Sequence, residues 1–597
     1  MVRQLWKGIC KALNTDIQLF STETVASSAE TGKAVLELAK ALNEYKGVPE
    51  LVPFVGNISS LLDVLNLPLV QVAGATLPFV SLATGMLKVY LEHTQREPSI
   101  EECVVLISQA AYLESFRVFL NSSENQTIRE KLLETPASEA FTKRLSKLGE
   151  KLELNGKEFE LDAKEAERAL ICFHESKLAE VFSPILSDRL QEAGLDETEA
   201  HIATERISRS TYRYMKRAFS SIRDSVKQLA ALYGSEWQQE LRIYDSIDRY
   251  LEEVISKKPL QQVFDESFTF EDIYVPLKVK PVKQDSHIDN QIGPLNIESW
   301  AESLLQDPKK QGQVLFIQGG PGRGKSVFCR MFADLVRRKL YPIWIPILIR
   351  LRDIETFDPN FEKTLQAAVG TDFATSDIGW LTDLNTRFLF ILDGFDELLL
   401  ERGISDDLKT FLYQVESFQA RCKENSSERG HRVLITGRPF ALHGLERLMP
   451  PNLERVQIVL MDQEIQGKWL AKWGRLCGTD TISAFQQFLH APSCPQQVKE
   501  LAQEPLLLYL LAAMHRDHRL DLEMFEGANS TGAKIQIYEE ALDWVLTKQR
   551  TEQGHNLNFK ITGLDTEDLR SVLADPCSAV MPAHLLQNLK SKRAIAF

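Results

Sequence analysis

The sequence predicts a multidomain protein with an all-α N-terminal domain, an α/β core built on a parallel sheet, and an α-helical C-terminal domain. Its 597 residues are enough for three or four domains. Over residues 211–233 and 241–255, apolar side chains recur three and four positions apart, as in amphipathic helices. Between residues 314 and 460, short apolar runs alternate with helical segments, which is typical of a buried parallel sheet.

The chain divides into five expected segments. Prolines interrupt the helical pattern after residue 255 and mark a connector, part of which (residues 268–279) looks extended. Asn296 can cap the helix that follows. The segments are a helical domain over residues 1–255, the connector over 256–296, the α/β core over 297–462, a second helical domain over 463–560 and an irregular tail over 561–597.

Five short apolar runs are the candidate strands of the core. They cover residues 314–318, 343–350, 388–393, 432–436 and 455–460. Because helices separate them, we expect right-handed crossovers between parallel strands. The helical pattern returns after residue 462.

Composition excludes some classes of function. The net charge of −14 and the pI of about 5.5 argue against general nucleic-acid binding, which needs a basic surface. The eight cysteines form no CxxC pair and suggest neither a zinc site nor a disulfide framework. Reduced thiols fit a cytoplasmic location.

One stretch, residues 64–87, contains no charged side chain and is long enough to span a bilayer. It also contains Pro68 and Pro78 among small polar residues. Two interpretations stay open: helices broken by proline and buried against other helices, or a segment that contacts a membrane.

The strongest motif follows the apolar run at residues 314–318. GGPGRGKS has the Walker A spacing and lies between a predicted strand and a predicted helix. Its glycines allow backbone N–H groups to surround phosphate oxygens, Lys325 should reach the β- and γ-phosphates, and Ser326 should ligate Mg²⁺. The predicted nucleotide-binding residues here are Gly319, Gly320, Pro321, Gly322, Arg323, Gly324, Lys325, Ser326 and Val327.

Two later strand ends complete the predicted site. FLFILDGFDE (residues 388–397) has the Walker B pattern of an apolar strand that ends in an acid. Asp393 ends the apolar run and should hold Mg²⁺, while Asp396 and Glu397 can orient or deprotonate the attacking water. In VLITGRP, Arg438 follows the next predicted strand and can report the γ-phosphate. No Asn-Lys-x-Asp motif is present, which favours ATP over GTP.

GGPGRGKS, FLFILDGFDEL and VLITGRP together resemble the NACHT module of the STAND class of ATPases, relatives of the NOD-like receptors. Gly394 after the first Walker B acid, with the acidic pair that follows, is the NACHT-like feature, and IPILIRLRD (residues 345–353) resembles the second NACHT strand. FTFEDIYVPLKV resembles the segment that precedes many bacterial NACHT cores, with Tyr274 or Pro276 near the base. The resemblance covers residues 265–560 well and residues 1–255 loosely.

The resemblance implies a cytoplasmic switch in signal transduction, innate immunity or antiviral defence. ADP would hold it closed, ATP exchange would permit homo-oligomerisation, and an unknown protein or pathogen-derived trigger would act on it. Pro505 would lie against the adenine or ribose. The tail departs from the family, because it shows neither a C-terminal repeat sensor nor a confident winged-helix histidine, so the chain is expected to be a truncated or frameshifted member.

Two other classes of function stay open. One is an AAA+-like motor ATPase, which would need steady turnover on a macromolecule and an arginine finger. The other is a helical membrane-active or adaptor module, with residues 64–87 as its membrane contact and a core stabilised by nucleotide.

Overall fold

The computed structural model describes most of the chain between residues 99 and 547. The described residues are 80, 83–84, 99–135, 137–141, 161–222, 236–264, 266–282, 288, 291–354, 358–402, 406–424, 430–439, 451–525 and 530–547, with two short strand pairs within 153–158 and 551–556. The predictions for the tail at 561–597, and for residues 64–87 apart from Val80, Ala83 and Thr84, lie outside the described residues.

The N-terminal region is built from helices around the long apolar helix α7. Its elements are α7 (Ile100–Asn121), η2 (Ser123–Asn125), α8 (Gln126–Glu134), β1 (Glu153–Leu154), β2 (Lys157–Glu158), α10 (Ala163–Ile171), η3 (Phe173–Glu175), α11 (Lys177–Glu192), α12 (Glu197–Ile222), α14 (Glu236–Tyr250) and the π-helical turn η5 (Leu251–Ile255). Helix α7 packs against α10 and α12. Its segment Cys103–Asn121 is the one described helix long and apolar enough to cross a membrane, and most of it is buried inside the protein.

A seven-stranded sheet forms the core. Its strands, in spatial order, are β4 (Leu295–Asn296), β3 (Lys278–Pro281), β9 (Leu453–Ile458), β5 (Val314–Gln318), β8 (Arg432–Gly437), β7 (Phe388–Asp393) and β6 (Ile345–Arg350). The five strands from β9 to β6 run parallel, so the predicted parallel sheet is right for them. It is wrong for β3 and β4, which pair antiparallel at the edge.

The connector explains this difference. We expected residues 268–279 to be extended, but they contain the one-turn helix α15 (Phe270–Ile273), which Thr269 and Asp272 close with a capping box. The chain then enters β3 and returns in β4 before the first core helix, and the described residues between these two strands contain no helix. Strands joined without a crossover pair antiparallel.

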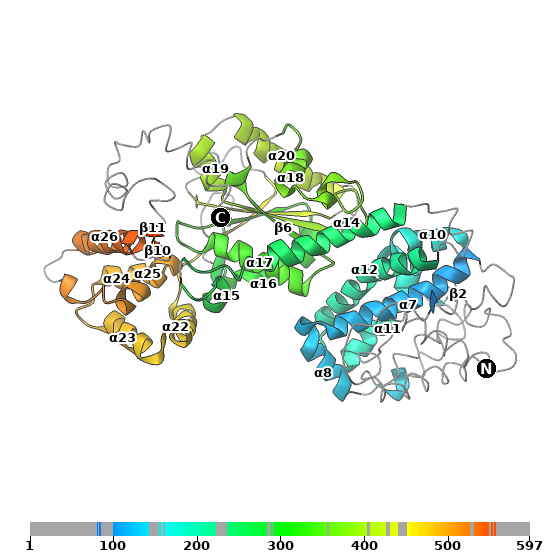
Figure 1. The fold of residues 1–597 in the computed structure, drawn as a ribbon, viewed down its shortest axis with the longest axis horizontal. Helices are drawn as coiled ribbons and strands as arrows, with labels where there is room; N and C mark the ends of the chain where they lie inside the picture. Colours follow the sequence, from blue (N-terminus) through cyan, green and yellow to red (C-terminus); the bar gives the residue numbers. More distant parts are fainter. Residues whose placement is uncertain are drawn as a thin grey trace.

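Helices cover both faces of the sheet. Figure 1 shows α16 (Ile297–Gln306) and α17 (Lys325–Lys339) on one face, and α18 (Phe361–Val369), α19 (Phe395–Arg402) and α20 (Asp406–Glu424) on the other. Short 3₁₀ turns lie at η6 (Pro308–Lys310), η7 (Leu351–Asp353) and η8 (Asp372–Thr375). Because helices lie on both sides, β5 and β8 are buried along their whole length, and each has a continuous apolar run in its sequence (residues 314–317 and 433–435) rather than an alternating pattern.

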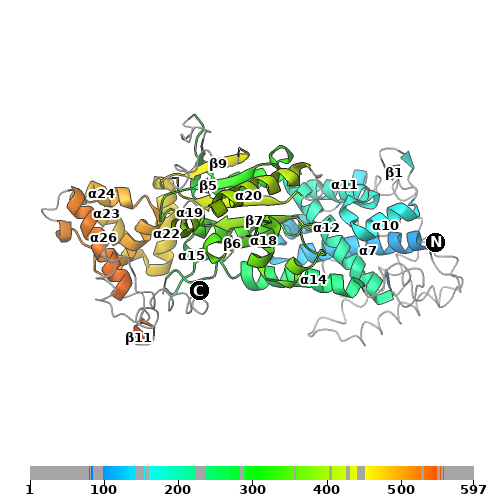
Figure 2. The ribbon, with the colours of Figure 1, turned by 90° about the horizontal axis from the view of Figure 1, so that it is seen from above.

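A C-terminal group of helices lies at the opposite end of the molecule from the N-terminal helices (Figure 2). It comprises α22 (Gln463–Cys477), α23 (Thr479–His490), α24 (Gln496–Leu501), α25 (Pro505–Arg516), η10 (Glu523–Phe525) and α26 (Ser530–Thr547), followed by the strand pair β10 (Thr551–Glu552) and β11 (His555–Asn556). The first of these helices begins where the Asp462 side chain accepts a hydrogen bond from the N–H of Ile465. Such an N-cap fixes the point at which the chain leaves the sheet.

The N-terminal helices dock on the core through polar contacts. The Arg206 guanidinium donates to the carbonyls of Arg338 and Tyr341, at 3.1 and 2.9 Å, and so supplies donors to the C-terminal end of α17. The Tyr244 hydroxyl hydrogen-bonds to Asp383 at 2.5 Å. Helix α17 is therefore held at its C-terminal end by the N-terminal region, while its N-terminal end opens onto the site described next.

Candidate nucleotide site

At two positions, the loop between β5 and α17 has a backbone conformation that only glycine adopts easily. Gly322 and Gly324 have φ of +71° and +76°. A Cβ at Gly322 would lie 3.2 Å from the Cβ of Leu506, and one at Gly324 would lie 3.1 Å from the Cδ1 of Leu277. The two glycines therefore also allow the loop to approach α25 and the connector closely.

The loop presents unpaired donors at the start of a helix. Helix α17 begins at Lys325, its N-cap Gly324 has no capping side chain, and within the described part of the chain the N–H groups of residues 322–327 have no backbone acceptor. The same residues line a cavity of about 320 Å³. Unpaired N–H groups at a helix N-terminus suit an anion, so this chain's loop fits a phosphate chain.

Lys325 lies inside this loop. Its Nζ donates to the carbonyl oxygens of Gly319 and Gly320, at 2.7 and 3.0 Å. Burial lowers the pKa of Lys325, and the nearby carboxylates of Asp396 and Asp393 oppose that effect. The ammonium is thus held by backbone oxygens that a bound phosphate could replace.

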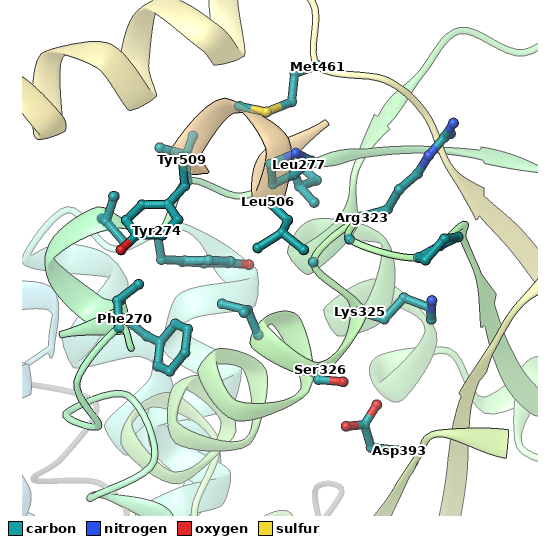
Figure 3. A pocket seen from close by; sticks show the side chains of 18 of the residues that line it. Phe270, Tyr274, Leu277, Arg323, Lys325, Ser326, Asp393, Met461, Leu506 and Tyr509 are labelled. Carbon is teal, nitrogen blue, oxygen red and sulfur yellow. The ribbon is translucent and has the colours of Figure 1, made fainter. Parts of the chain in front are cut away.

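Asp393 lies at the carboxyl end of β7, as expected. Its Oδ1 accepts a hydrogen bond from the Thr436 hydroxyl at 2.6 Å, and the Cys329 thiol lies 3.7 Å away. Strand β8 lies between β5 and β7, which explains how Thr436 reaches Asp393. Figure 3 shows the Ser326 hydroxyl and the Asp393 carboxylate on the same side of the cavity as Lys325, so the predicted phosphate and metal residues meet in one cavity.

The two further acids of the Walker B segment are both paired with arginines. Asp396 Oδ2 lies 2.6 Å from Arg438 Nε, and its side chain is only 4% exposed. Glu397 Oε2 lies 3.3 Å from an Arg352 nitrogen, with both side chains more than 40% exposed. Arg438, which we expected beside the γ-phosphate, therefore lies at the cavity but contacts an acid.

The other half of the cavity is apolar. Pro505 opens α25 and lines the cavity, as does Tyr274, whereas Pro276 does not. Burial, and then the neighbouring Glu298, raise the pKa of Tyr274 well above its usual range. The sequence prediction missed the remaining apolar lining, which includes Phe270, Leu277, Met461, Trp469, Leu506 and Tyr509. No local pattern separates such residues from ordinary core residues.

A second cluster that the sequence prediction missed lies in the N-terminal region. Cys172 Sγ is 3.4 Å from His174 Nδ1, and Glu175 completes a set with metal-ligand chemistry, detectable in the sequence only as a Cys-x-His-Glu spacing. Burial, and then Arg209 and Arg387, hold the pKa of His174 well below its usual range. The same two guanidiniums would repel a bound cation, so we assign no metal to this cluster.

Comparison with known proteins yields one family. Residues 49–270 match the model of the NACHT N-terminal Helical domain 3. No curated protein matches the chain. The matched region holds the docked N-terminal helices and ends within the connector, before strand β3 begins at Lys278. At family level, this NACHT-associated domain suggests a signalling or defence NTPase. The match therefore supports membership of the NACHT family.

Proposed function

We propose that this chain is an ATP-binding NACHT switch of the STAND class that hydrolyses ATP slowly and acts in signalling or defence. The observation that supports this most is the single cavity lined by Lys325, Ser326 and Asp393 at one end and by apolar side chains at the other. Mononucleotides need this combination of charged and apolar surface.

The residues divide the work of binding by their chemistry. The N–H groups of residues 322–327 would hold the α- and β-phosphates, and Lys325 would exchange its carbonyl partners for the β- and γ-phosphates. Ser326 and Asp393 would hold Mg²⁺, which neutralises phosphate charge when bound. The apolar lining around Tyr274 and Tyr509 would receive the adenine, which favours aromatic faces.

Hydrolysis would depend on Asp396 and Glu397. Either carboxylate can orient a water or accept its proton, but each has an arginine partner in this arrangement. Arg438 would have to leave Asp396 to reach a γ-phosphate. That exchange would leave Asp396 able to act on water, and it would make binding of ATP differ from binding of ADP.

A difference between ATP and ADP can shift a conformational equilibrium only if the site touches a part that moves. The phosphate loop contacts α25 directly, since the N–H of Leu506 donates to the carbonyl of Gly322 at 3.1 Å. Arg323 lies 3.6 Å from Glu504 in the same helical group. We propose that the state of the nucleotide sets the position of these helices, and that ATP permits opening and assembly of several copies.

The partners are proposed on the same basis. ATP or ADP with Mg²⁺ would occupy the site in the cytoplasm, and other copies of the chain would assemble on it. A protein or pathogen-derived trigger, and a membrane contact through residues 64–87, remain predictions from the sequence.

Light scattering after size exclusion tests the switch. With Mg²⁺ and a non-hydrolysable ATP analogue, the full chain should form a larger species than with ADP, and Lys325→Ala should form the same species with both nucleotides. Arg421→Gln, a change on the distant helix α20, should behave as the wild type. Unchanged assembly and nucleotide affinity in Lys325→Ala would refute the proposal, and rapid steady turnover without assembly would favour a motor.

A further inference from the structure

A second cavity lies beside the first, with Asp393 in the wall of both. Its volume is about 190 Å³, and three cationic side chains line it, those of Lys258, Arg330 and Arg350. Asp353 is the other acid in its wall. The cavity is thus mainly polar, in contrast to the apolar half of the nucleotide site.

The three cations have no carboxylate partner in the part of the chain that the structure describes. No ion pair or hydrogen bond joins any of them to an acid. Asp353 instead lies 3.8 Å from Arg352, and Asp393 accepts a hydrogen bond from Thr436. Both acids in the wall therefore have other residues as contact partners, and they act on the cations only through longer-range attraction, Asp353 on Lys258 and Asp393 on Arg330.

Rigid elements bring these cations together. Arg350 ends β6 in register with Asp393, and Arg330 lies one turn beyond Ser326 on α17, with its guanidinium 4.9 Å from the centre of the Phe270 ring. Lys258 follows the π-helical turn η5. Burial, and then Arg350 and Arg330, lower the pKa of Lys258, which indicates that the three charges act on one another.

Asp353 and Asp393 attract Lys258 and Arg330, but two acids offset only part of the charge of three cations, and an anion between the cations would remove the remaining repulsion. Guanidiniums form paired hydrogen bonds with the oxygens of a phosphate group. We propose that this cavity is an oxyanion site, formed by Lys258, Arg330 and Arg350, that binds a phosphate group as inorganic phosphate or as part of a small phosphate ester.

An anion in this site would hold the N-terminal region against the core, an effect that the nucleotide switch alone does not provide. Lys258 lies in the region matched by the N-terminal helical domain, whereas Arg330 and Arg350 belong to the core. An anion bound by all three would favour the docked arrangement of the two regions, because a ligand stabilises the state that forms its site. The inference does not require nucleotide hydrolysis.

Equilibrium dialysis with radiolabelled inorganic phosphate tests the proposal on the full chain. All variants also carry Lys325→Ala as a common background, so that the first cavity contributes less to the measured phosphate binding. In that background phosphate should still bind, and adding Arg350→Gln or, separately, Lys258→Gln should weaken binding about tenfold or more. Arg421→Gln removes the same charge from the exposed surface of α20 and should leave binding unchanged.

Ribose 5-phosphate in place of inorganic phosphate distinguishes the two sources of the anion. Tighter binding of the ester would assign the site to a phosphorylated small molecule, and tighter binding of the ion would assign it to free phosphate. If neither binds, or if both cavity variants bind phosphate as well as the background does, the oxyanion site is refuted. Lys258→Gln keeps the test valid if Arg350→Gln fails to fold, since Lys258 lies outside the sheet.

Discussion

The ion pair between Arg438 and Asp396 should be the contact that ATP has to displace. Replacing Asp396 with Asn keeps the shape of the side chain and removes its charge. Arg438 should then be released more easily toward a γ-phosphate, whereas ADP offers no such group. We therefore expect Asp396→Asn to raise the affinity for a non-hydrolysable ATP analogue relative to ADP, and to slow hydrolysis.

The size of this effect follows from the surroundings of the pair. The two atoms lie 2.6 Å apart, and the exposed fractions of the Arg438 and Asp396 side chains are 28% and 4%. An exposed pair contributes about 0–1 kcal/mol, and breaking a fully buried one costs about 3–5 kcal/mol. An intermediate pair should contribute about 1–2 kcal/mol, which changes the ratio of affinities roughly 5- to 30-fold.

Isothermal titration calorimetry with the analogue and with ADP measures this ratio. Glu397→Gln is the matched control, because it makes the same charge change one residue away and its partner is Arg352 on an exposed pair. The control should change the ratio by less than about fivefold. A ratio that stays constant or falls in Asp396→Asn would refute the exchange of partners.

Three further outcomes test other parts of the site and fold. Gly324→Ala should weaken ATP binding about tenfold, because Gly324 has a positive φ and the added Cβ would press on Leu277. Gly467→Ala is the control and should not weaken ATP binding, because its added Cβ has no atom within 4 Å. Fluorescence titration with ATP compares the two variants. Chelation of Mg²⁺ should weaken ATP binding more than ADP binding, and equal effects on the two nucleotides would contradict the metal role of Asp393. Burial and the two nearby guanidiniums hold the pKa of His174 in the folded chain below that in the unfolded chain, so the free energy of unfolding should decrease as the pH is lowered through about 6.5. Urea unfolding at a pH above and a pH below this value should show that the free energy of unfolding of His174→Gln decreases less than that of the wild type as the pH is lowered.

The sequence predicted the parts of the site that have fixed chemical spacing. Lys325, Ser326 and Asp393 were identifiable because a glycine loop must follow a strand and an acid must end another. The five parallel strands were identifiable for the same reason: each is a short apolar run between helices. Strand β9 begins two residues earlier than expected, at Leu453, because apolar character alone does not set strand pairing.

The rest depended on contacts between distant segments. Nothing in the local sequence shows that Arg438 would meet Asp396, or that Tyr509 and Phe270 would face the same cavity. The antiparallel strand β3, which lies between the edge strand β4 and β9, was hidden by prolines, because proline removes a backbone donor and is uncommon in the middle of a sheet. Lys258 lies far along the chain from Arg350, so no spacing pattern could join them.

Titration of ATP into the Mg²⁺-containing full chain tests the central claim most directly. We expect one ATP to bind per chain in the wild type, and no measurable binding when Lys325 is replaced with Ala. Equal binding by both proteins would show that the nucleotide, if bound, does not occupy the cavity between Lys325 and Asp393.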